Sequence, residues 1–405
     1  MHGVLMNATV EQPETTLTTT PEHHLQPYFP ALAQFSSFKQ LEASAIYHEL
    51  RPEIERVLNG LAQEDFTTAR HRNRASDSIK ATAWNIERGV RLESIIGVLK
   101  EHPQIRESDL LLLTELDYGM ARTRNRFVAR EIAEALEMSY AFAPCYLALT
   151  KGNGSETRVE GENTQALHGN ALLSRYPLHG AHSLALPNGK DKLRGVEKRL
   201  GCQRAVIADV SHPSGIFRAV SLHLDAHSTQ KHRQLQMELV LDHLASLQPQ
   251  LPILIGGDWN TSGYNSKRAV YAIAGFWRRV MMGVSHVLKN HYVHPERWFE
   301  RGLFRELERR GFNYLDLNED GVGTLHYDVK NIAVHENLSD WVPQWCFRFL
   351  HWSLREHQGR ASLKLDWFAG KEIAPALAPK VVGNLSDDAG ALSDHDAIVL
   401  NFVLQ

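Results

Sequence analysis

LPILIGGDWN, the stretch from Leu251 to Asn260, is where the fold prediction begins. Its first five residues are mostly apolar, and a short run of this kind predicts a buried strand. Gly256 and Gly257 follow, and two glycines allow the backbone to turn sharply and to approach a neighbour closely. Asp258 and Asn260 come next, where a carboxylate and an amide can share one small ligand. Taken alone, such a pair is more typical of an Asx turn or a helix cap.

Short apolar segments recur along the chain, with helical patterns between them. Strands are predicted over residues 80–86, 109–116, 168–176, 203–210, 217–224, 363–370 and 392–404. Helices are predicted over residues 92–102, 124–137 and 231–247. Neighbouring strands with helices between them indicate sheets that pack together and are covered by helices.

The hydrophobic pattern divides the chain into two parts. Residues 1–79 contain a polar tail that we expect to be disordered, a helical arm over 30–62 and a polar linker over 65–79. Residues 80–405 form the main domain. Within it, residues 264–360 interrupt the alternation of strands and helices, and we interpret them as a helical insertion.

Composition describes an ordinary globular protein of 405 residues, with 43% apolar and 22% charged residues. The formal net charge of −3 means that any basic surface must be local. Three cysteines are too few and too scattered for a disulfide framework. The N-terminus lacks the pattern of a signal peptide, and no apolar run is long enough for a membrane span. We therefore expect a cytoplasmic protein.

Several polar side chains lie at the ends of predicted strands, and their chemistry suits phosphate ester hydrolysis. That reaction needs a cation to neutralise the phosphate oxygens and a water that is oriented and deprotonated. Glu115 ends the strand DLLLLTEL and Asn85 ends KATAWNI, so their oxygens are candidate magnesium ligands. A carboxylate capped by local amides and an asparagine in a turn are the alternatives.

Two histidines complete this set. A histidine that moves a proton needs a carboxylate to fix its tautomer, and Asp366 could supply this partner to His395 from a neighbouring strand. His223 ends the strand FRAVSLHL, where it could donate to a phosphate oxygen. A structural ion pair is the alternative for His395, and a structural histidine is the alternative for His223.

Three tryptophans adjoin these polar residues: Trp84, Trp259 and Trp367. Aromatic rings beside polar strand ends would exclude water and hold the polar groups in place, although ordinary core packing explains them equally well.

Seven short motifs carry a resemblance to a known family. They are WNI at 84–86, TEL ending at 116, NALLSRYPL at 170–178, SLHLD at 221–225, GGDWN at 256–260, LDWF at 365–368 and SDHDA at 393–397. In this order they resemble the endonuclease/exonuclease/phosphatase superfamily of DNase I-like hydrolases. The resemblance spans roughly residues 80–404, apart from the insertion.

The resemblance implies an α+β fold, a four-layered α/β/β/α sandwich of two mostly antiparallel sheets flanked by helices. It also implies hydrolysis of a phosphoester with Mg2+, or with Mn2+ as an alternative ion. On these positions the expected metal ligands are Glu115, Asn85 and Asp394.

The resemblance also assigns roles in the reaction. Asp258 would orient the attacking water, and Asn260 would bind the phosphoryl oxygen in the transition state. His395, supported by Asp366, would transfer a proton or hold the phosphate, and His223 would contact a phosphate oxygen. Two further positions that match are less consistently tied to chemistry, and we take them as candidates for substrate binding: Asn170 and Arg204.

Two departures from known branches leave the substrate open. The sequence lacks the PAWCDR-type segment of inositol polyphosphate phosphatases and has SLKLDWF where abasic-site endonucleases have GWRxDY. What remains resembles a broad bacterial branch that includes sphingomyelinase-like and tyrosyl-DNA phosphodiesterase-like enzymes.

The insertion is locally basic and aromatic. Between residues 264 and 310 ten lysines and arginines stand against four glutamates, with Trp277, Trp298, Phe299 and Phe304 among them. A segment near the end of the insertion, residues 341–357, is also rich in aromatics. Such patterns suit nucleic acid or an anionic membrane surface equally well, and a helical subdomain with a solvated charged face is the alternative.

The sequence therefore predicts a metal-dependent phosphoester hydrolase of the phosphodiesterase or nuclease kind. The alternatives are a phospholipid phosphodiesterase or phosphatase at a membrane surface, and a non-catalytic binding module on the same scaffold.

Overall fold

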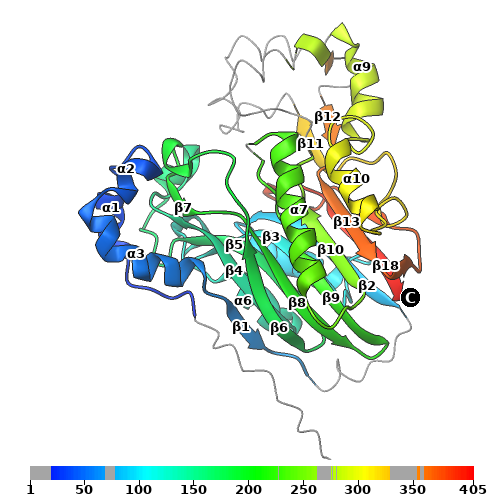
Figure 1. The fold of residues 1–405 in the computed structure, drawn as a ribbon, viewed down its shortest axis with the longest axis horizontal. Coiled ribbons are helices and arrows are strands. Elements are labelled where there is room, and N and C mark those ends of the chain that lie inside the picture. The colour runs from blue at the N-terminus through cyan, green and yellow to red at the C-terminus, as the bar shows by residue number, and fades with distance from the viewer. Residues whose placement is uncertain are drawn as a thin grey trace, which may run out of the picture.

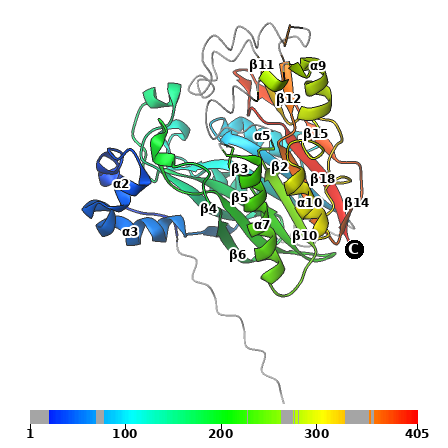
Figure 2. The ribbon, with the colours of Figure 1, turned by 45° about the horizontal axis from the view of Figure 1, so that its top comes forward.

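Two β-sheets lie face to face, with helices on the outer face of each (Figures 1 and 2). The computed structural model describes residues 20–68, 78–226, 228–261, 275, 277–279, 281–328, 354–355 and 360–405. Three sequence predictions fall outside these described residues: the disorder of residues 1–19, most of the linker, and the aromatic segment at 341–353. No helix in the described ranges is both long and apolar enough to cross a membrane.

The first sheet has nine strands. Its path is β1 (Ala62–Asp65), β4 (Ser139–Ala148), β5 (Leu167–Ser174), β3 (Leu110–Tyr118), β2 (Ile79–Arg88), β18 (Ala397–Leu404) and β14 (Ile373–Pro375). Off this path, β7 (Arg199–Gly201) pairs with β4, and β15 (Lys380–Val382) pairs with β18. The pair β2–β3 is parallel and the other pairs of this sheet are antiparallel.

The second sheet has five strands, in the order β13 (Asp366–Lys371), β10 (Ile253–Asp258), β9 (Gly215–Ser221), β8 (Arg204–His212) and β6 (Leu178–Ala185). Here β9–β10 is the parallel pair. Both sheets are thus mostly antiparallel, as expected.

Helices form the two outer layers. Helices α5 (Leu92–Glu101) and α6 (Val128–Leu136) pack on the first sheet. Helices α7 (Gln230–Ser246) and α10 (Arg301–Arg309) pack on the second, where Figure 1 shows them in front of its strands. This arrangement confirms the four-layered α/β/β/α sandwich.

The apolar run of β3 shows how the sequence builds these layers. Side chains alternate between the two faces of a strand. Leu111 and Leu113 therefore pack under the helices, whereas Leu110 and Leu112 face the second sheet. Both faces of the strand are buried, which explains its continuous run of leucines.

Gly256 and Gly257 allow a close approach, as expected, but they do not form a turn. Both lie inside β10, which continues to Asp258. A Cβ at Gly256 would lie 2.6 Å from a side-chain carbon of Leu112 in the facing sheet, and one at Gly257 would lie 2.2 Å from the carbonyl oxygen of Leu222. Glycine is needed at both positions because a side chain at 256 would clash with the facing sheet and one at 257 would clash with the backbone of the neighbouring segment.

The N-terminal segment is bound to the first sheet. Helices η1 (Gln26–Tyr28), α1 (Phe29–Leu32), α2 (Phe38–Glu42) and α3 (Ala45–Leu58) occupy the predicted helical arm. They pack against residues of β4, β5 and β7 through a separate apolar cluster at one end of the sandwich (Figure 1). The chain then forms the edge strand β1, part of which the sequence prediction assigned to the linker.

The described part of the insertion is mixed, with helices α9 (Val284–Val287), η5 (Leu288–Tyr292) and α10, and with a two-stranded ribbon of β11 (Leu325–Asp328) and β12 (Arg360–Leu363). Because α10 packs on α7 and the ribbon leads into β13, this segment belongs to the sandwich at both ends. A purely helical insertion was therefore wrong for residues 325–328.

Short elements complete the chain: the 3-10 helices η2 (Ala121–Thr123), η3 (Gly154–Arg158) and η4 (Lys192–Arg194), and the small hairpin of β16 (Ser386–Asp387) and β17 (Gly390–Ala391).

Candidate active site

Six of the predicted residues meet at one edge of the two sheets: Asn85, Glu115, His223, Asp258, Asp366 and His395. They come from β2, β3, the segment after β9, β10, the start of β13 and the segment before β18. Side chains separated by up to 310 positions are thereby joined in one chain of contacts.

The backbone has a left-handed conformation at several residues of the site. Glu115 has φ 57°, Asn260 has φ 52°, and Glu87 and Arg88 have φ 45° and 69°. Left-handed conformations are uncommon for residues other than glycine and cost free energy unless neighbouring contacts hold them. The pairing of β2 with β3 shifts register at the same place. These irregularities turn the polar side chains of both strands toward the site.

Asn85 is the link at the centre. Its Nδ2 donates to Glu115 Oε1 at 3.2 Å and to Asp258 Oδ2 at 3.1 Å. Its Oδ1 accepts from the backbone N–H of Glu87 at 3.1 Å. As placed, Asn85 offers N–H groups rather than an oxygen to the site, so its predicted role as a metal ligand stays a prediction.

Asp258 is fully surrounded by partners. Its Oδ1 accepts from the backbone N–H of Asn260 at 2.8 Å, while Oδ2 lies 3.4 Å from His223 Nε2 and 3.7 Å from His395 Nε2. Burial raises the pKa of Asp258, and the charge of Asp366 adds to this against the opposing imidazoles. A buried carboxylate with a raised pKa is a better proton acceptor than a solvated one.

His395 and Asp366 form a buried pair, in which His395 Nδ1 donates to Asp366 Oδ2 at 2.8 Å. Burial lowers the pKa of His395, but the charges of Asp366, Asp258 and Asp394 outweigh it and hold the pKa well above the ordinary value. His395 is therefore an imidazolium near neutral pH, with Nε2 directed toward Asp258.

Thr324, which the sequence analysis missed, holds Asp366 in place. Its hydroxyl donates to Asp366 Oδ2 at 2.6 Å and accepts from the backbone N–H groups of Leu365 and Asp366. Thr324 lies in the insertion, immediately before β11. No sequence pattern marks it, because the contact depends on how the ribbon folds back onto β13.

The three tryptophans are buried and two of them donate hydrogen bonds. Trp84 Nε1 donates to the carbonyl oxygen of His395 at 2.9 Å, and Trp367 Nε1 donates to Thr261 Oγ1 at 2.9 Å. Trp259 stacks on Trp367. They pack in the core and also fix the segments that carry Asn85, Asp258 and Asp366, so the two explanations hold together.

Glu115 lies in a strongly charged environment. Burial raises its pKa, but the charges of Arg88, His223 and His168 outweigh it and hold the pKa well below the ordinary value. The carboxylate is therefore ionised and suited to bind a cation.

The two candidates for substrate binding have internal partners. The side chain of Asn170 accepts from the backbone N–H of Glu115 at 3.4 Å and donates to the carbonyl oxygen of Arg204 at 2.8 Å, so it supports the backbone at Glu115. The guanidinium of Arg204 donates to Ser183 and to Asn59 at the end of α3. Arg204 thus fastens the helical arm and has no contact with the cluster.

The donor set fits a hard divalent cation. Burial and the charge of Asp394 raise the pKa of Glu87 to about 7, with a smaller contribution from Glu115. Glu87 therefore interacts unfavourably with the carboxylates of Asp394 and Glu115, with Arg88 and His395 opposing this, and a divalent cation would relieve the repulsion. Glu87 is not among the residues predicted from sequence; its position two residues after Asn85 is the signal that marks it.

Asn260 and Asp394 frame the cluster. Asn260 Nδ2 donates to the carbonyl oxygen of Leu224 at 3.0 Å, which fixes the segment that follows His223. Asp394 is exposed beside His395 and accepts weakly from Ser393 Oγ at 3.5 Å.

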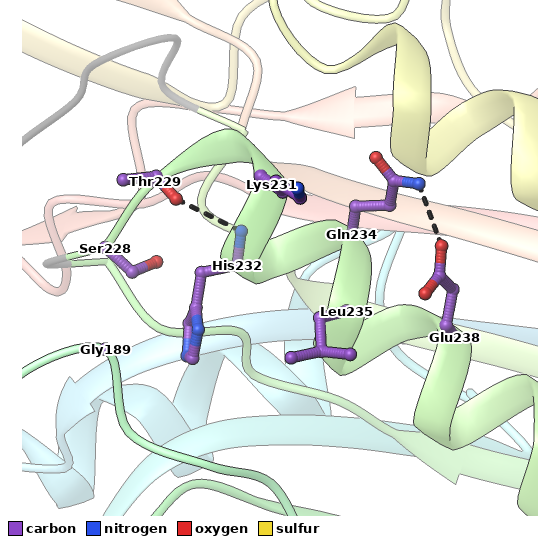
Figure 3. A pocket seen from close by; sticks show the side chains of 8 residues that line it. All are labelled: Gly189, Ser228, Thr229, Lys231, His232, Gln234, Leu235 and Glu238. Carbon is purple, nitrogen blue, oxygen red and sulfur yellow. Dashed lines mark hydrogen bonds between the residues drawn. The ribbon is translucent and has the colours of Figure 1, made fainter.

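A separate pocket of about 360 Å³ lies at the N-terminal end of α7 (Figure 3). Its lining residues Gly189 and Ser228 both hydrogen-bond to Asp225. Lys231 and His232 lie along the same wall, and Leu235 points into the open space (Figure 3). It contains none of the predicted site residues.

Comparison with known proteins places the chain among relatives. The model of the family described as the endonuclease/exonuclease/phosphatase family matches residues 82–318, more than half of the chain. No curated protein matches it.

Several solved structures are similar. An endonuclease/exonuclease/phosphatase from Beutenbergia cavernae is 15% identical, with 81% of this chain and 72% of that chain covered and a TM-score of 0.48. The 3'-5' exonuclease from Neisseria meningitidis is 14% identical, with 80% and 100% covered and a TM-score of 0.46. The human nocturnin catalytic domain is 15% identical, with 85% and 96% covered and a TM-score of 0.43.

Proposed function

Because this chain belongs to the endonuclease/exonuclease/phosphatase family, we propose that it is a divalent-metal-dependent phosphodiesterase. Family membership supports phosphoester hydrolysis in general terms. The metal requirement, the diester preference and the roles of individual residues are the proposal. The single observation that carries it is the convergence of Asp258, His395 and Glu115 on one site from three different strand ends.

Glu115, with Glu87 and Asp394 beside it, would hold Mg2+ or Mn2+. Such an ion neutralises phosphate oxygens and stabilises the leaving oxygen. Asn85 connects this carboxylate cluster to Asp258, so that the position of the substrate and the position of the base are fixed by one amide.

Asp258 is the group that takes the proton from the attacking water. Its carboxylate is held by the N–H of Asn260 and by Asn85, and its burial makes it more basic than an exposed aspartate. The neighbouring His223 and Asn260 would bind the phosphoryl oxygens.

His395 acts as a cation. Asp366 and Thr324 keep its imidazolium oriented, with Nε2 available to a phosphate oxygen beside Asp258. Charge developing on the phosphoryl group in the transition state is then stabilised by a preorganised donor in a buried site.

The direct test is hydrolysis of bis(p-nitrophenyl) phosphate with Mg2+ and with EDTA. Glu115→Ala and His395→Ala should each nearly abolish turnover while far-ultraviolet circular dichroism stays unchanged. Glu55→Ala, which removes an exposed carboxylate of α3, is the matched control. Normal turnover in either site variant, or activity that survives EDTA, would refute the proposed roles.

An anionic membrane surface is a second proposed contact, and the insertion carries it. Large apolar side chains are exposed there, with Met281 81%, Trp298 53%, Met282 41% and Trp277 38% exposed. Arg278 is exposed among them. Sedimentation with phosphatidylserine vesicles, against binding to single-stranded DNA, separates the two substrate classes. Salt-sensitive binding to DNA alone would favour a nuclease and contradict the membrane contact.

A further inference from the structure

Arg88 is an arginine at the active site that is held by ion pairs rather than by hydrogen bonds. It follows Glu87 at the end of β2, and its left-handed backbone turns the side chain inward, where it is 14% exposed. None of the described residues accepts a hydrogen bond from its guanidinium, and Nε is buried without a hydrogen-bond partner. Arginine has five donors, and leaving them unpaired at a largely buried position is costly.

The ion pairs of Arg88 place it at the border of the carboxylate cluster. Its Nη1 lies 3.8 Å from Glu87 Oε1, and its Nε lies 3.1 Å from Glu156 Oε1. Asp258 has ion pairs with His223 and His395 instead. Arg88 therefore pairs with Glu87 and Glu156 and not with Asp258, and its charge acts on Glu115.

A buried network fixes Arg88 from behind. Glu156, which pairs with Arg88, also binds Arg122 at 3.1 Å. Arg122 in turn holds Asp117 through two hydrogen bonds and Glu197 through one. Arg199 pairs with Glu197 as well, so the carboxylates of this network connect Arg88, Arg122 and Arg199.

His168 adds a second donor on this side. Its Nδ1 donates to Asp117 Oδ1 at 2.9 Å, and it lies on the same face of β5 as Asn170, which binds the backbone of Glu115. Two loops, residues 150–163 and 188–200, contribute Glu156 and Glu197 to this arrangement. They hold a cationic group beside Glu115 in a fixed position.

We propose that Arg88, with His168, forms a second anion-binding subsite that takes a phosphate group adjoining the scissile phosphoester. The proposal rests on the proposed function, because the scissile group must lie at Asp258. A cation on Glu115 would offset the carboxylates around Arg88, and its planar donors match the oxygens of a phosphate. Neighbouring phosphates occur both in polynucleotides and in phosphorylated inositol headgroups, which share this chemistry.

The test is equilibrium binding, measured by calorimetry in the full-length Asp258→Asn variant so that bound probes are not consumed. One pair of probes is thymidine 3′,5′-bisphosphate and thymidine 5′-monophosphate. The other is inositol 1,4-bisphosphate and inositol 1-phosphate. In at least one pair the bisphosphate should bind about tenfold more tightly or better, as one additional arginine–phosphate contact implies.

Arg88→Ala should reduce this preference to about twofold or less while the monophosphate binds as before. Arg88→Lys should retain part of it, and it serves as the second variant if Arg88→Ala lowers the melting temperature. Arg91→Ala is the matched control, since Arg91 is three residues away and its donors are already used by Asp387, Ala389 and Gly390. It should keep the full preference.

Three results would overturn the proposal: no bisphosphate preference in the parent variant, a preference that survives Arg88→Ala, or an equal loss for both probes of a pair. The pair that shows the preference identifies the source of the second phosphate. Failure of the proposed function is seen separately, as absence of bis(p-nitrophenyl) phosphate hydrolysis by the chain without substitutions.

Discussion

Two histidine–aspartate pairs border the cluster around Glu115, and they have nearly the same geometry. His395 donates to Asp366 at 2.8 Å and His168 donates to Asp117 at 2.9 Å. The aspartates differ in their other partners. Asp117 is bound by two nitrogens of Arg122, whereas Asp366 accepts from the uncharged hydroxyl of Thr324.

The second partner of the aspartate, an arginine in one pair and a threonine in the other, therefore decides what the histidine can do. An arginine neutralises the carboxylate, so this pair fixes the ring of His168 beside the proposed phosphate subsite and takes no part in the chemical step. A hydroxyl orients the carboxylate without removing its charge, so that charge acts on the imidazole. A histidine and an aspartate in contact are therefore not enough to identify a catalytic pair.

The largest expected difference between the pairs is in turnover. His395→Ala should lower kcat for bis(p-nitrophenyl) phosphate by about 10²- to 10³-fold, the range for loss of one donor to the charge that develops in the transition state. His168→Ala should lower it by less than about tenfold, because His168 is assigned to binding. Steady-state kinetics on both variants checks this, and equal losses would break the comparison.

Stability should show the opposite order. Arg122→Met removes the cation that Asp117, Glu197 and the half-buried Glu156 share, and leaving the two buried charges uncompensated costs about 3–5 kcal/mol of the free energy of unfolding. Thr324→Val should cost about 1–3 kcal/mol, since only hydrogen bonds are lost. Urea unfolding followed by tryptophan fluorescence measures both. A smaller loss for Arg122→Met than for Thr324→Val would mean that the network around Asp117 is not the structural one.

Thr324 sharpens the comparison further. Without its hydroxyl, Asp366 is less well oriented, and we expect Thr324→Val to lower kcat by about tenfold at unchanged KM. Thr324→Ser keeps the hydroxyl and should restore most of kcat. If the serine variant is as slow as the valine variant, the hydrogen bond to Asp366 is not what Thr324 contributes.

Glu87, which lies between the two pairs, gives the smallest effect. Its pKa is raised to about 7, so its carboxyl is protonated below that pH and must ionise to bind a cation. The ionised fraction rises from about a tenth at pH 6 to about nine tenths at pH 8. Mn2+ affinity should therefore increase about ninefold over this interval.

Titration of Mn2+ by electron paramagnetic resonance at both pH values measures this increase. Glu87→Gln should bind more weakly and vary by about twofold or less over the same interval. A rise in affinity that persists in Glu87→Gln would assign the titrating group to another residue.

Much of the fold could be predicted from sequence because burial leaves a periodic signal. The leucines of β3 and the glycines of β10 mark central strands directly. Strands β4 and β6 were missed. The first contains Pro144 within SYAFAPCYLA, and the second is mostly part-exposed, with histidines and glycine where an apolar alternation would be expected.

The site could be predicted in part for a related reason. Asp258, Asp366 and His395 stand next to apolar strands, so their local context marks them. Thr324 and Arg88 have no such context, since one depends on a ribbon that folds back onto β13 and the other on a left-handed backbone. Arg204 matches a position of the family, but its guanidinium donates to Ser183 and Asn59.

In the proposed mechanism Asp258 and His395 act together in a single chemical step. A double-mutant cycle tests it most directly, with kcat measured for Asp258→Asn, His395→Ala and the combination. Groups that act as a unit give strongly non-additive losses. We expect kcat of the double variant to be about as low as that of the slower single variant. Losses that multiply, or near-normal turnover in either single variant, would contradict it.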